Sequence, residues 1–487
     1  MNVDTASLES MCELIVDCPH STPKWTDSGV VVLRNQNIRN GQLKLSSPSY
    51  TNEAGYQSRV KRAVPQVGDI IFTREAPMGE VCLIPSGLKC CLGQRQVLLR
   101  PKETVNGEYL YWALQSPFVQ HQISWNEGTG TTVSNVRIPV LKSLQIPRRG
   151  SDEQKIADAL SSLAHKIRLN HQINQTLEQI AQALFKSWFV DFEPVKAKIV
   201  ALEAGGSEED ALLAAMQAIS GTSLFDAGAS AAGAEEQLTR LQAERPEQYA
   251  ELRATAELFP SAMQDSELGE IPVGWEVDSL ASKIDVFNGF AFKSGDYVKQ
   301  PGIFVLRTKN FNNENIAVRL SDDVFLPEGF GSSHKKYLCE AYDYHLIMVG
   351  ASVGKTGIIF PCNLPALRNQ NMWCFRPKFG ARIGKAFTKH MLDELVSQKV
   401  GLASGSAREF FRKGDFQNQT ICFGSEHIQN SFHSIVFSLL EKQAINVAEN
   451  GCLSALRDAL LPKLLSGELP MTDTDARLAK VEEPVDV

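Results

Sequence analysis

Two long stretches of the chain repeat mainly apolar side chains at alternating spacings of four and three residues, with polar side chains in the middle of each stretch. In the first stretch these positions are Ile156, Leu160, Leu163, Ile167, Asn170, Asn174, Leu177, Ala181, Leu184 and Trp188. In the second they are Ile428, Phe432, Ile435, Leu439, Lys442, Asn446, Glu449, Leu453, Leu456 and Leu460. This spacing is typical of a coiled-coil seam, so it predicts two long helices, over residues 151–194 and 425–470.

Both predicted seams are apolar at their ends and polar in the middle, and Asn174 and Asn446 hold equivalent positions. An asparagine in a seam weakens it but specifies its register, because a slipped partner leaves the amide unpaired. We therefore predict that the two helices pair with each other, antiparallel, with their polar middles facing. The alternative is two independent amphipathic helices, each lying on its own domain.

The start of the first helix carries a recognisable signal in residues 151–154, SDEQ. The Ser151 hydroxyl has the spacing to accept from the third helical amide, and Gln154 the spacing to reach back. The acidic residues between them favour the positive end of the helix dipole. This pattern predicts a capping box that opens the helix at residue 151.

The region before each helix has a different pattern, with short β-rich runs bounded by Gly, Pro or Asn. In the first region these runs cover residues 30–33, 69–72, 81–84 and 97–99. Runs of this length and composition predict strands rather than helices. Residues 1–150 are therefore expected to form a domain rich in strands and loops.

The second region repeats the first. Residues 29–34, GVVVLR, recur as 302–307, GIFVLR, and residues 92–101, LGQRQVLLRP, are echoed by 368–377, RNQNMWCFRP. Near the end of each copy lies a small polar glycine loop, GTGTT at 128–132 and SGSAR at 404–408. The predicted fold is α+β, with two similar mixed α/β domains, 1–150 and 269–424, each followed by a long helix. The two helices, 151–194 and 425–470, pair as an antiparallel coiled coil.

Two remaining segments have no repeated partner and are acidic. Residues 195–268 are rich in Ala and Glu and predict an acidic helical insertion or linker, and residues 471–487 form an acidic tail. The chain as a whole has a formal charge of −7. The repeated regions have the opposite sign, with 16 basic against 12 acidic residues in 1–150 and 19 against 14 in 271–424. Basic domains beside acidic spacers suit nucleic-acid binding, although a small positive charge is also ordinary for domains of this size.

The cysteine pattern and the hydropathy bound the cellular setting. The ten cysteines are scattered and form no C-x-x-C pair, and the first residues do not resemble a signal peptide. Reduced thiols are therefore expected. Because no uncharged apolar run is long enough to span a bilayer, we expect a cytoplasmic protein with no membrane contact.

Motifs for catalysis are incomplete. Residues 345–356, HLIMVGASVGKT, resemble a phosphate-binding loop but lack one residue between the glycines, and a strand-like run follows where such a loop needs a helix. We predict a β-hairpin there, with Lys355 near phosphate. The chain has no G-x-S-x-G, no metal-ligand cluster, and no Pro-Pro for the loop with which amino-group methyltransferases hold a flipped base. We expect no catalytic and no metal-ligating residues.

Recognition chemistry, by contrast, lies at matching places in both copies. Asn and Gln side chains can pair with adenine edges and Arg with guanine, and glycine-Ser/Thr loops offer hydroxyls and amides to phosphate. Asn and Gln are also common in turns, and a shared fold alone would make them recur. The differences between the copies favour two unlike half-sites on DNA. The candidate DNA-binding residues are Arg34, Asn35, Gln36, Gln94, Arg95, Gln96, Thr129, Thr131, Thr132, Arg307, Lys309, Asn310, Lys355, Asn369, Gln370, Asn371, Ser404, Ser406 and Arg408.

Three further segments resemble signatures of the specificity subunits of type I restriction-modification systems. They are residues 183–194, ALFKSWFVDFEP, residues 269–276, GEIPVGWE, and residues 460–468, LLPKLLSGE. The resemblance covers nearly the whole chain and follows the family's order of target-recognition domain, helix, target-recognition domain and helix. The acidic insertion departs from the shortest members of the family, which leaves its role open.

The resemblance implies a non-catalytic subunit that binds double-stranded DNA at an asymmetric two-part sequence. Each domain would read one half, and the paired helices would set the gap and dock two modification subunits. Those partners would bind S-adenosylmethionine and methylate adenine, and ATP-dependent restriction subunits would join for cleavage. Trp188 and Phe189 would then contact a partner, or else pack in the core. The candidate partner and coiled-coil residues are Leu163, Ile167, Asn170, Asn174, Leu177, Trp188, Phe189, Leu439, Asn446, Leu453, Leu456 and Leu460.

Two other functions remain open at this stage. A coiled-coil scaffold without sequence specificity would bind partners and show no preference among DNA sequences. A self-contained DNA methyltransferase or nuclease would need cofactor and catalytic motifs that the sequence does not contain.

Overall fold

The structure is a computed structural model that describes residues 4–125, 135–223, 231–299, 302–312, 314–350, 352–400 and 411–471. The chain divides into two compact units, residues 1–169 with 450–487, and residues 170–449. Each unit contains one of the repeated domains and a part of each of the two long helices. Each is described by itself below.

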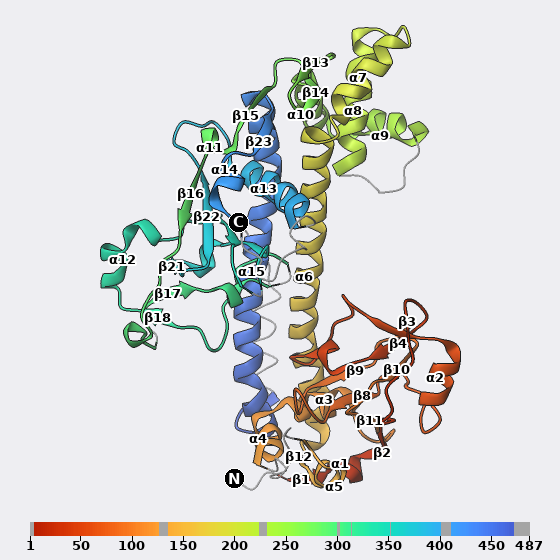
Figure 1. The fold of residues 1–487 in the computed structure, drawn as a ribbon. Coiled ribbons are helices and arrows are strands. Elements are labelled where there is room, and N and C mark those ends of the chain that lie inside the picture. The colour runs from red at the N-terminus through yellow and green to blue at the C-terminus, as the bar shows by residue number, and fades with distance from the viewer. Residues whose placement is uncertain are drawn as a thin grey trace. The chain divides into compact units, whose positions relative to one another are not determined.

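The first domain is built on two small sheets in the first unit (Figure 1). One has the order β2-β11-β8-β9, with all neighbours antiparallel. The other has the order β10-β4-β7-β3, in which β10 and β4 are parallel. The strands are β2 (Cys12–Asp17), β3 (Trp25–Thr26), β4 (Val30–Leu33), β7 (Ser49–Thr51), β8 (Ile70–Thr73), β9 (Val81–Leu83), β10 (Cys90–Leu92) and β11 (Gln96–Pro101).

Shorter elements close this domain. Strand β1 (Thr5–Ser7) pairs with β12 (Gln145–Pro147), and β5 (Ile38–Arg39) pairs with β6 (Gln42–Leu43), both antiparallel. The main helix, α3 (Gly107–Gln115), buries six consecutive residues from Tyr109 to Leu114. The other helices are α1 (Leu8–Met11), α2 (Glu53–Arg59), α4 (Pro117–Trp125) and α5 (Ile138–Ser143).

The second domain repeats the order of the larger sheet and three of the four strands of the smaller sheet in the second unit. Its larger sheet has the order β16-β22-β19-β20, all antiparallel, and its smaller sheet has the order β18-β17-β21, in which β17 and β21 are parallel. The strands are β16 (Ile284–Asn288), β17 (Ile303–Leu306), β18 (Phe325–Leu326), β19 (Tyr344–Ile347), β20 (Thr356–Ile358), β21 (Ala366–Arg368) and β22 (Met372–Pro377). The repeat predicted from the sequence is therefore confirmed as a repeat of fold.

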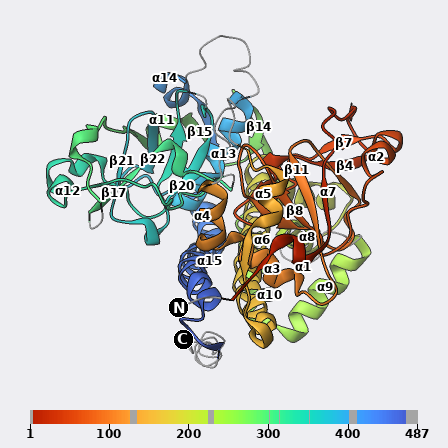
Figure 2. The same ribbon diagram turned by 90° about the horizontal axis from the view of Figure 1, so that it is seen from below.

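The second domain is completed by the strand pair β15 (Glu276–Ser279) and β23 (Thr420–Phe423), and by α13 (Lys385–Val400). Its small helices are α11 (Leu280–Lys283), α12 (Gly329–Ser333) and α14 (Lys413–Gln417). Figures 1 and 2 both show the larger sheet nearer to the helix α15 than the smaller sheet is.

The two predicted long helices are present as α6 (Glu153–Phe189) and α15 (Glu426–Ser466). In the first unit, the start of α6 and the end of α15 share one core, which contains Leu160, Leu163, Leu460 and Leu464. In the second unit, the end of α6 shares a core with the start of α15, including Trp188 and Phe432. In each unit the start of one helix therefore meets the end of the other, which confirms antiparallel pairing.

The polar middles of the two helices meet within the second unit, as predicted. Asn446 Nδ2 donates to Asn174 Oδ1 at 2.8 Å, and Asn170 Nδ2 donates to Glu449 at 2.7 Å. Both asparagines of the first pair are almost fully buried. The paired amides satisfy each other inside the seam, which is the arrangement that specifies one register.

The start of α6 differs from the expected capping box. Residues 150–152 form a 3-10 turn, and α6 begins at Glu153, whose Oε1 accepts from the Arg149 amide at 3.0 Å and from Arg148 Nε at 2.7 Å. Gln154 instead bonds Asp158 and Asn106. A buried carboxylate with an arginine partner makes stronger, charge-assisted bonds than the Ser–Gln pair offers, so it takes the capping role.

Both helices end earlier than predicted, and the seam of α15 runs differently. Helix α6 ends at Phe189, because Phe192 has a left-handed φ of 55° before the next helix begins. On α15, Val436 and Leu440 are fully buried while Leu439 is only half-buried. The buried residues here are spaced by four, so the buried face turns gradually around the helix. This allows this part of α15 to pack against α13 as well as α6.

The acidic insertion forms four helices, α7 (Glu193–Glu203), α8 (Glu208–Ser223), α9 (Ala231–Glu244) and α10 (Pro246–Glu257), followed by the hairpin β13 (Met263–Ser266) and β14 (Gly269–Pro272). It packs into the core of the second unit, where Phe259 meets the Trp188 ring edge-on at 5.1 Å between centroids. Across the described ranges, none of the helices combines the length and apolar character needed to cross a membrane.

Candidate nucleic-acid interface

In the first domain, the ends of two parallel strands bring two predicted segments together. Strands β4 and β10 pair in parallel, with Leu33 opposite Leu92, so the residues that follow them emerge at the same edge of the sheet. The Gly93 amide donates to Leu33 O at 2.7 Å. The turn between β8 and β9 joins them, since the Arg74 amide donates to Arg95 O at 2.9 Å. We call these three segments the loop edge.

The second domain has a loop edge with the same backbone hydrogen bonds. Strands β17 and β21 pair in parallel, and the Asn369 amide donates to Leu306 O at 3.0 Å. The turn between β19 and β20 joins them, since the Met348 amide donates to Asn371 O at 3.1 Å. Arg95 and Asn371 hold the same left-handed conformation, with φ of 66° and 71°. The two loop edges are therefore equivalent in their backbones.

A buried asparagine supports each loop edge from below. Asn37 Oδ1 accepts from the Arg34 amide at 2.9 Å, and Asn310 Oδ1 accepts from the Arg307 amide at 3.0 Å. Asn310 also donates to Asp323 at 2.7 Å and is fully buried. The interpretation of Asn310 as a base-contacting residue is therefore corrected, because its side-chain amide is buried and hydrogen-bonded within the domain.

Gln96 is corrected on the same ground. Its side chain is fully buried, and its Oε1 accepts from the Gly93 amide at 3.1 Å. Its neighbours Gln94 and Arg95 are exposed at the surface of the loop. The buried glutamine thus holds the turn while the two residues before it face outwards.

The exposed arginines of the first loop edge make few intramolecular contacts. Arg34 lies 5.5 Å from the Trp25 ring and 3.5 Å from the Ser49 hydroxyl, and Arg95 pairs with Glu75 at 3.0 Å. These cations can exchange such partners for a polyanion. Gln36 is exposed, whereas Asn35 is half-buried and donates to the Glu75 carbonyl.

The cations of the second loop edge have stronger intramolecular partners. Arg307 donates to the Asp322 carbonyl at 2.8 Å and lies 3.9 Å from Asp323, and Lys309 pairs with the Asp322 carboxylate. Gln370 and Asn371 are exposed, and Asn369 is half-buried. The second edge thus presents the amides of Gln370 and Asn371, whereas the first presents the guanidinium groups of Arg34 and Arg95 beside the amide of Gln94. Lys355 lies at the end of the β19–β20 turn, where partial burial lowers the pKa of its amine.

Six predicted residues cannot be placed. Thr129, Thr131, Thr132, Ser404, Ser406 and Arg408, from the two glycine loops, lie outside the described residues. The described neighbour of the first loop, Trp125 at the end of α4, is 80% exposed. It was not among the residues predicted from the sequence.

Each domain also contains a buried ion pair that the sequence reading missed. Arg100 contacts both oxygens of Asp69 at 2.8 Å, and Arg376 contacts those of Asp343 at 2.6–3.0 Å. Burial of Asp343 opposes ionisation, yet the bonds from Arg376 hold the pKa of its carboxyl below the usual value. The Arg-Pro pair that ends β11 and β22 was the available signal, since an arginine inside a buried strand needs an anion.

Two groups of side chains lie close enough together to hold a metal ion, which the sequence did not suggest. They are Asp343 with His345 and Cys374, and Glu178 with His390 and Asp393. In both groups protein cations already pair with the carboxylates. Arg376 and Lys385 contact Asp343, and Lys389 contacts Glu178 and Asp393.

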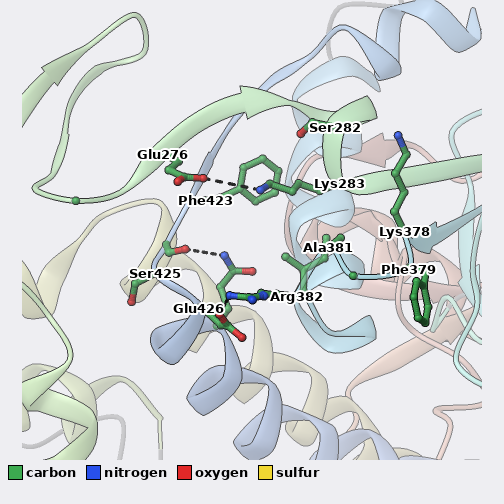
Figure 3. Close-up of a pocket in the computed structure, with 15 residues that line it drawn as sticks. Glu276, Ser282, Lys283, Lys378, Phe379, Ala381, Arg382, Phe423, Ser425 and Glu426 are labelled. Carbon is green, nitrogen blue, oxygen red and sulfur yellow. Dashed lines mark hydrogen bonds and ion pairs between the residues drawn. The ribbon is translucent and has the colours of Figure 1, made fainter.

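A cavity of about 580 Å³ lies where the second domain meets the start of α15 (Figure 3). Its charged residues are mostly paired, since Arg382 lies 2.6 Å from Glu426 and Lys283 lies 3.8 Å from Glu276. Phe379 on its rim is fully exposed. Nothing in this lining pairs a nucleophile with a base, so it suggests contact rather than chemistry.

Trp188 and Phe189 are not surface residues. Both are buried, and Phe189 packs against Phe432 and Phe387 with ring centroids 5.2 and 4.9 Å apart. Of the two roles that the sequence allowed, core packing is the one observed.

Comparison with known proteins gives a consistent family. The sequence model of the type I restriction modification DNA specificity domain matches residues 2–179. The type I restriction enzyme HindI specificity subunit of Haemophilus influenzae is 34% identical over 334 residues, which cover 67% of this chain and 69% of the relative. The MjaIX specificity subunit of Methanocaldococcus jannaschii is 26% identical over 417 residues, covering 82% and 78%. A crystal structure of a type I S subunit from M. genitalium superposes with a TM-score of 0.49 at 16% identity, covering 95% and 96%.

Proposed function

The chain belongs to the family of specificity subunits of type I restriction-modification systems, and on that premise we propose that its two domains recognise the two unlike halves of one DNA target. Subunits of this family recognise DNA targets and assemble with the other subunits of the system. The proposal concerns how this chain does so. Its asymmetric target would be double-stranded DNA with a fixed gap between the halves.

One observation carries the proposal: the two loop edges share a backbone but differ in side chains. Arg95 occupies the position that Asn371 occupies in the second domain, whereas the residue before each of them is a glutamine, Gln94 and Gln370. Arg favours guanine edges, and Asn and Gln favour adenine edges, so equal backbones with unequal side chains favour unequal half-targets. The net positive charge of both domains supports the contact with phosphate.

The chain would act without catalysing a reaction itself. The carboxylates of both metal-compatible groups are paired with cations, and most charged groups around the cavity are paired as well. Two modification subunits would supply S-adenosylmethionine and methylate adenine, docking on the paired helices, and restriction subunits would join them for ATP-dependent cleavage. The ten free cysteines fit a cytoplasmic setting.

The test is a map of modified adenines. The chain is co-expressed with its modification subunit in a host without restriction systems, and modified bases are mapped by single-molecule sequencing. We expect one two-part motif with a fixed gap. Replacing residues 271–424 with another recognition domain should change the second half of the motif and leave the first.

Point substitutions sharpen the test. Gln94→Ala with Arg95→Ala should alter or abolish recognition of the first half while the complex still assembles. The control is Gln57→Ala with Lys61→Ala, which are exposed and lie in and after α2. Helix α2 follows β7, whose last residue pairs with the start of β4, so the control lies away from the loop edge. An unchanged motif in the Gln94/Arg95 variant would contradict the role of these two residues in DNA recognition and favour a coiled-coil scaffold without sequence specificity.

A further inference from the structure

A continuous line of buried polar contacts joins the helix pair to the second domain. On the helices, Gln443 Nε2 donates to Asn174 O at 3.1 Å and lies 3.4 Å from Glu178 Oε2. Glu178 Oε1 accepts from Lys389 Nζ on α13. Lys389 also donates to Asp393 at 2.9 Å, and Asp393 accepts from the Tyr344 hydroxyl on β19 at 2.8 Å.

Lys389, at the centre of this line, is deeply buried, and its two carboxylate partners are partly buried. The side chain of Lys389 is 5% exposed, and those of Glu178 and Asp393 are 22% and 19% exposed. Burying three charges is costly, and an apolar contact of the same volume often stabilises a fold as well or better. Buried polar contacts instead specify one relative position of the two elements. A displaced carboxylate loses its hydrogen-bond partner, whereas a displaced methyl group still makes apolar contacts.

The surroundings make this geometry matter. A cavity of about 670 Å³ borders the network between α6, α13 and the β19–β20 turn, and its lining includes Gln182, Phe185, Asn315, His390 and Asp393. On the side of this cavity, no packed side chains among the described residues restrain the second domain, so there the polar contacts oppose a tilt on α6. Strand β19 leads directly into the loop edge, so a tilt at Tyr344 would move the recognition side chains.

Among the described residues, the first domain shows no such network where α3 meets α6. There α3 contacts α6 through Trp112 Nε1, which donates to the Ser161 hydroxyl at 3.0 Å, and Ser161 donates to Glu108 at 2.7 Å. These bonds are partly exposed and involve a single charge. The charged network is thus particular to the second domain.

We propose that Glu178, Lys389 and Asp393 are positioning residues that hold the second domain at one angle on the helix pair and thereby determine the gap length that the complex accepts. This rests on the proposed function, since a gap exists only if both domains read one target. The three side chains need not touch DNA. They act by holding β19 and its loop edge in place.

The test uses the complex with the modification subunit and a set of DNA duplexes that keep both half-targets and vary the gap. The variant Glu178→Gln, Lys389→Met, Asp393→Asn removes all three charges together, so no buried charge is left unpaired. We expect methylation at the native gap to persist. We expect the methylation rate at gaps one base pair longer or shorter to rise about tenfold relative to the native gap, equivalent to about 1.4 kcal/mol of lost discrimination.

Two controls accompany the variant. Glu209→Gln with Arg253→Met removes a more exposed ion pair that lies within the acidic insertion, and Ser161→Ala breaks the contact between α3 and α6 in the first domain. Both should leave gap preference unchanged. If the triple variant does not fold, Glu178→Asp keeps the charge but withdraws the carboxylate from Lys389, and it should relax the gap in the same direction.

The outcomes separate the two proposals. If the unmodified complex shows no two-part motif, the proposed function fails. If it shows one and the folded variants keep the native gap preference, the positioning role is wrong. Loss of the second half-target at every gap would also overturn it, because the network would then maintain the domain itself rather than its angle.

Discussion

At the scale of single residues, recognition and support are divided between adjacent positions. Gln94 and Arg95 face outwards while Gln96, next in the chain, is buried and bonds the Gly93 amide. The left-handed φ of Arg95 contributes to this change of direction, because Arg95 lies in the short turn between β10 and β11. One local conformation therefore exposes two side chains and buries the third.

The buried polar groups of the second domain predict a pH dependence of its stability. His345 is fully buried, and burial lowers its pKa from 6.5 to about 4. The charge of Asp343 raises this pKa, whereas the charges of Arg368 and Arg376 lower it further. As the pH falls, His345 is therefore protonated near pH 6.5 in the unfolded chain but only near pH 4 in the folded domain. Stability is full above pH 6.5 and falls as the pH falls through this window, by about 1.4 kcal/mol per pH unit.

This dependence can be measured by urea unfolding of the chain between pH 7 and pH 5. In the variant His345→Asn, the unfolding free energy should change less steeply with pH than in the unmodified chain. His427→Asn is the matched control, because His427 is exposed at the start of α15. Equal slopes for all three proteins would contradict the buried, neutral state of His345.

At the scale of elements, the helix pair combines apolar ends with a polar middle. The apolar ends supply burial, and the polar middle supplies register, because Asn174 and Asn446 satisfy each other only in one alignment. The same middle begins the line of contacts that reaches Lys389. The elements are therefore joined by polar contacts where alignment matters and by apolar contacts elsewhere.

The asparagine pair predicts a non-additive effect on stability. Asn174→Leu should lower the unfolding free energy by about 1–3 kcal/mol, because it leaves the buried Asn446 amide without its acceptor. Asn446→Leu in addition should restore much of this loss, since no unpaired amide then remains at this position. Denaturant titration of the single and double variants measures the coupling.

The exposed neighbour Gln175 provides the reference for this pair. Gln175→Leu lies on the same helix but faces solvent, so its effect should stay within about 0.5 kcal/mol. A single Asn174→Leu variant as stable as the unmodified chain would show that the buried amide pair does not hold the seam.

At the scale of the whole molecule, the chain has two compact units with separate cores. We expect two unfolding transitions in scanning calorimetry. Phe387→Ala, in the core of the second unit, should remove about 3–5 kcal/mol and lower only one transition temperature. Leu110→Ala, in the core of the first unit, should remove about 2–5 kcal/mol and lower only the other. A single transition lowered by both substitutions would contradict this independence.

The sequence by itself determined the two long helices, their antiparallel pairing, the repeated domain and the family. Each of these depends on a pattern that is local or that recurs: the spacing of Leu160 and Leu163, the matched Asn174 and Asn446, and the repeated strand ends. Apolar periodicity reports which face of a helix is buried, and a repeat reports a shared fold. These features can therefore be inferred without knowing any long-range contact.

Only the tertiary structure decided which polar side chains are exposed and what the buried ones contact. A glutamine in a turn looks the same in the sequence whether it is buried and bonds its own loop, as Gln96 does, or is exposed and bonds a neighbouring segment, as Gln94 does through the His20 carbonyl. The pairing of Lys389 with Glu178 joins residues far apart in the chain, and its energy comes from burial that no local pattern records. The physical reason is that the environment of a polar group, unlike periodicity, is a property of all the elements packed around it.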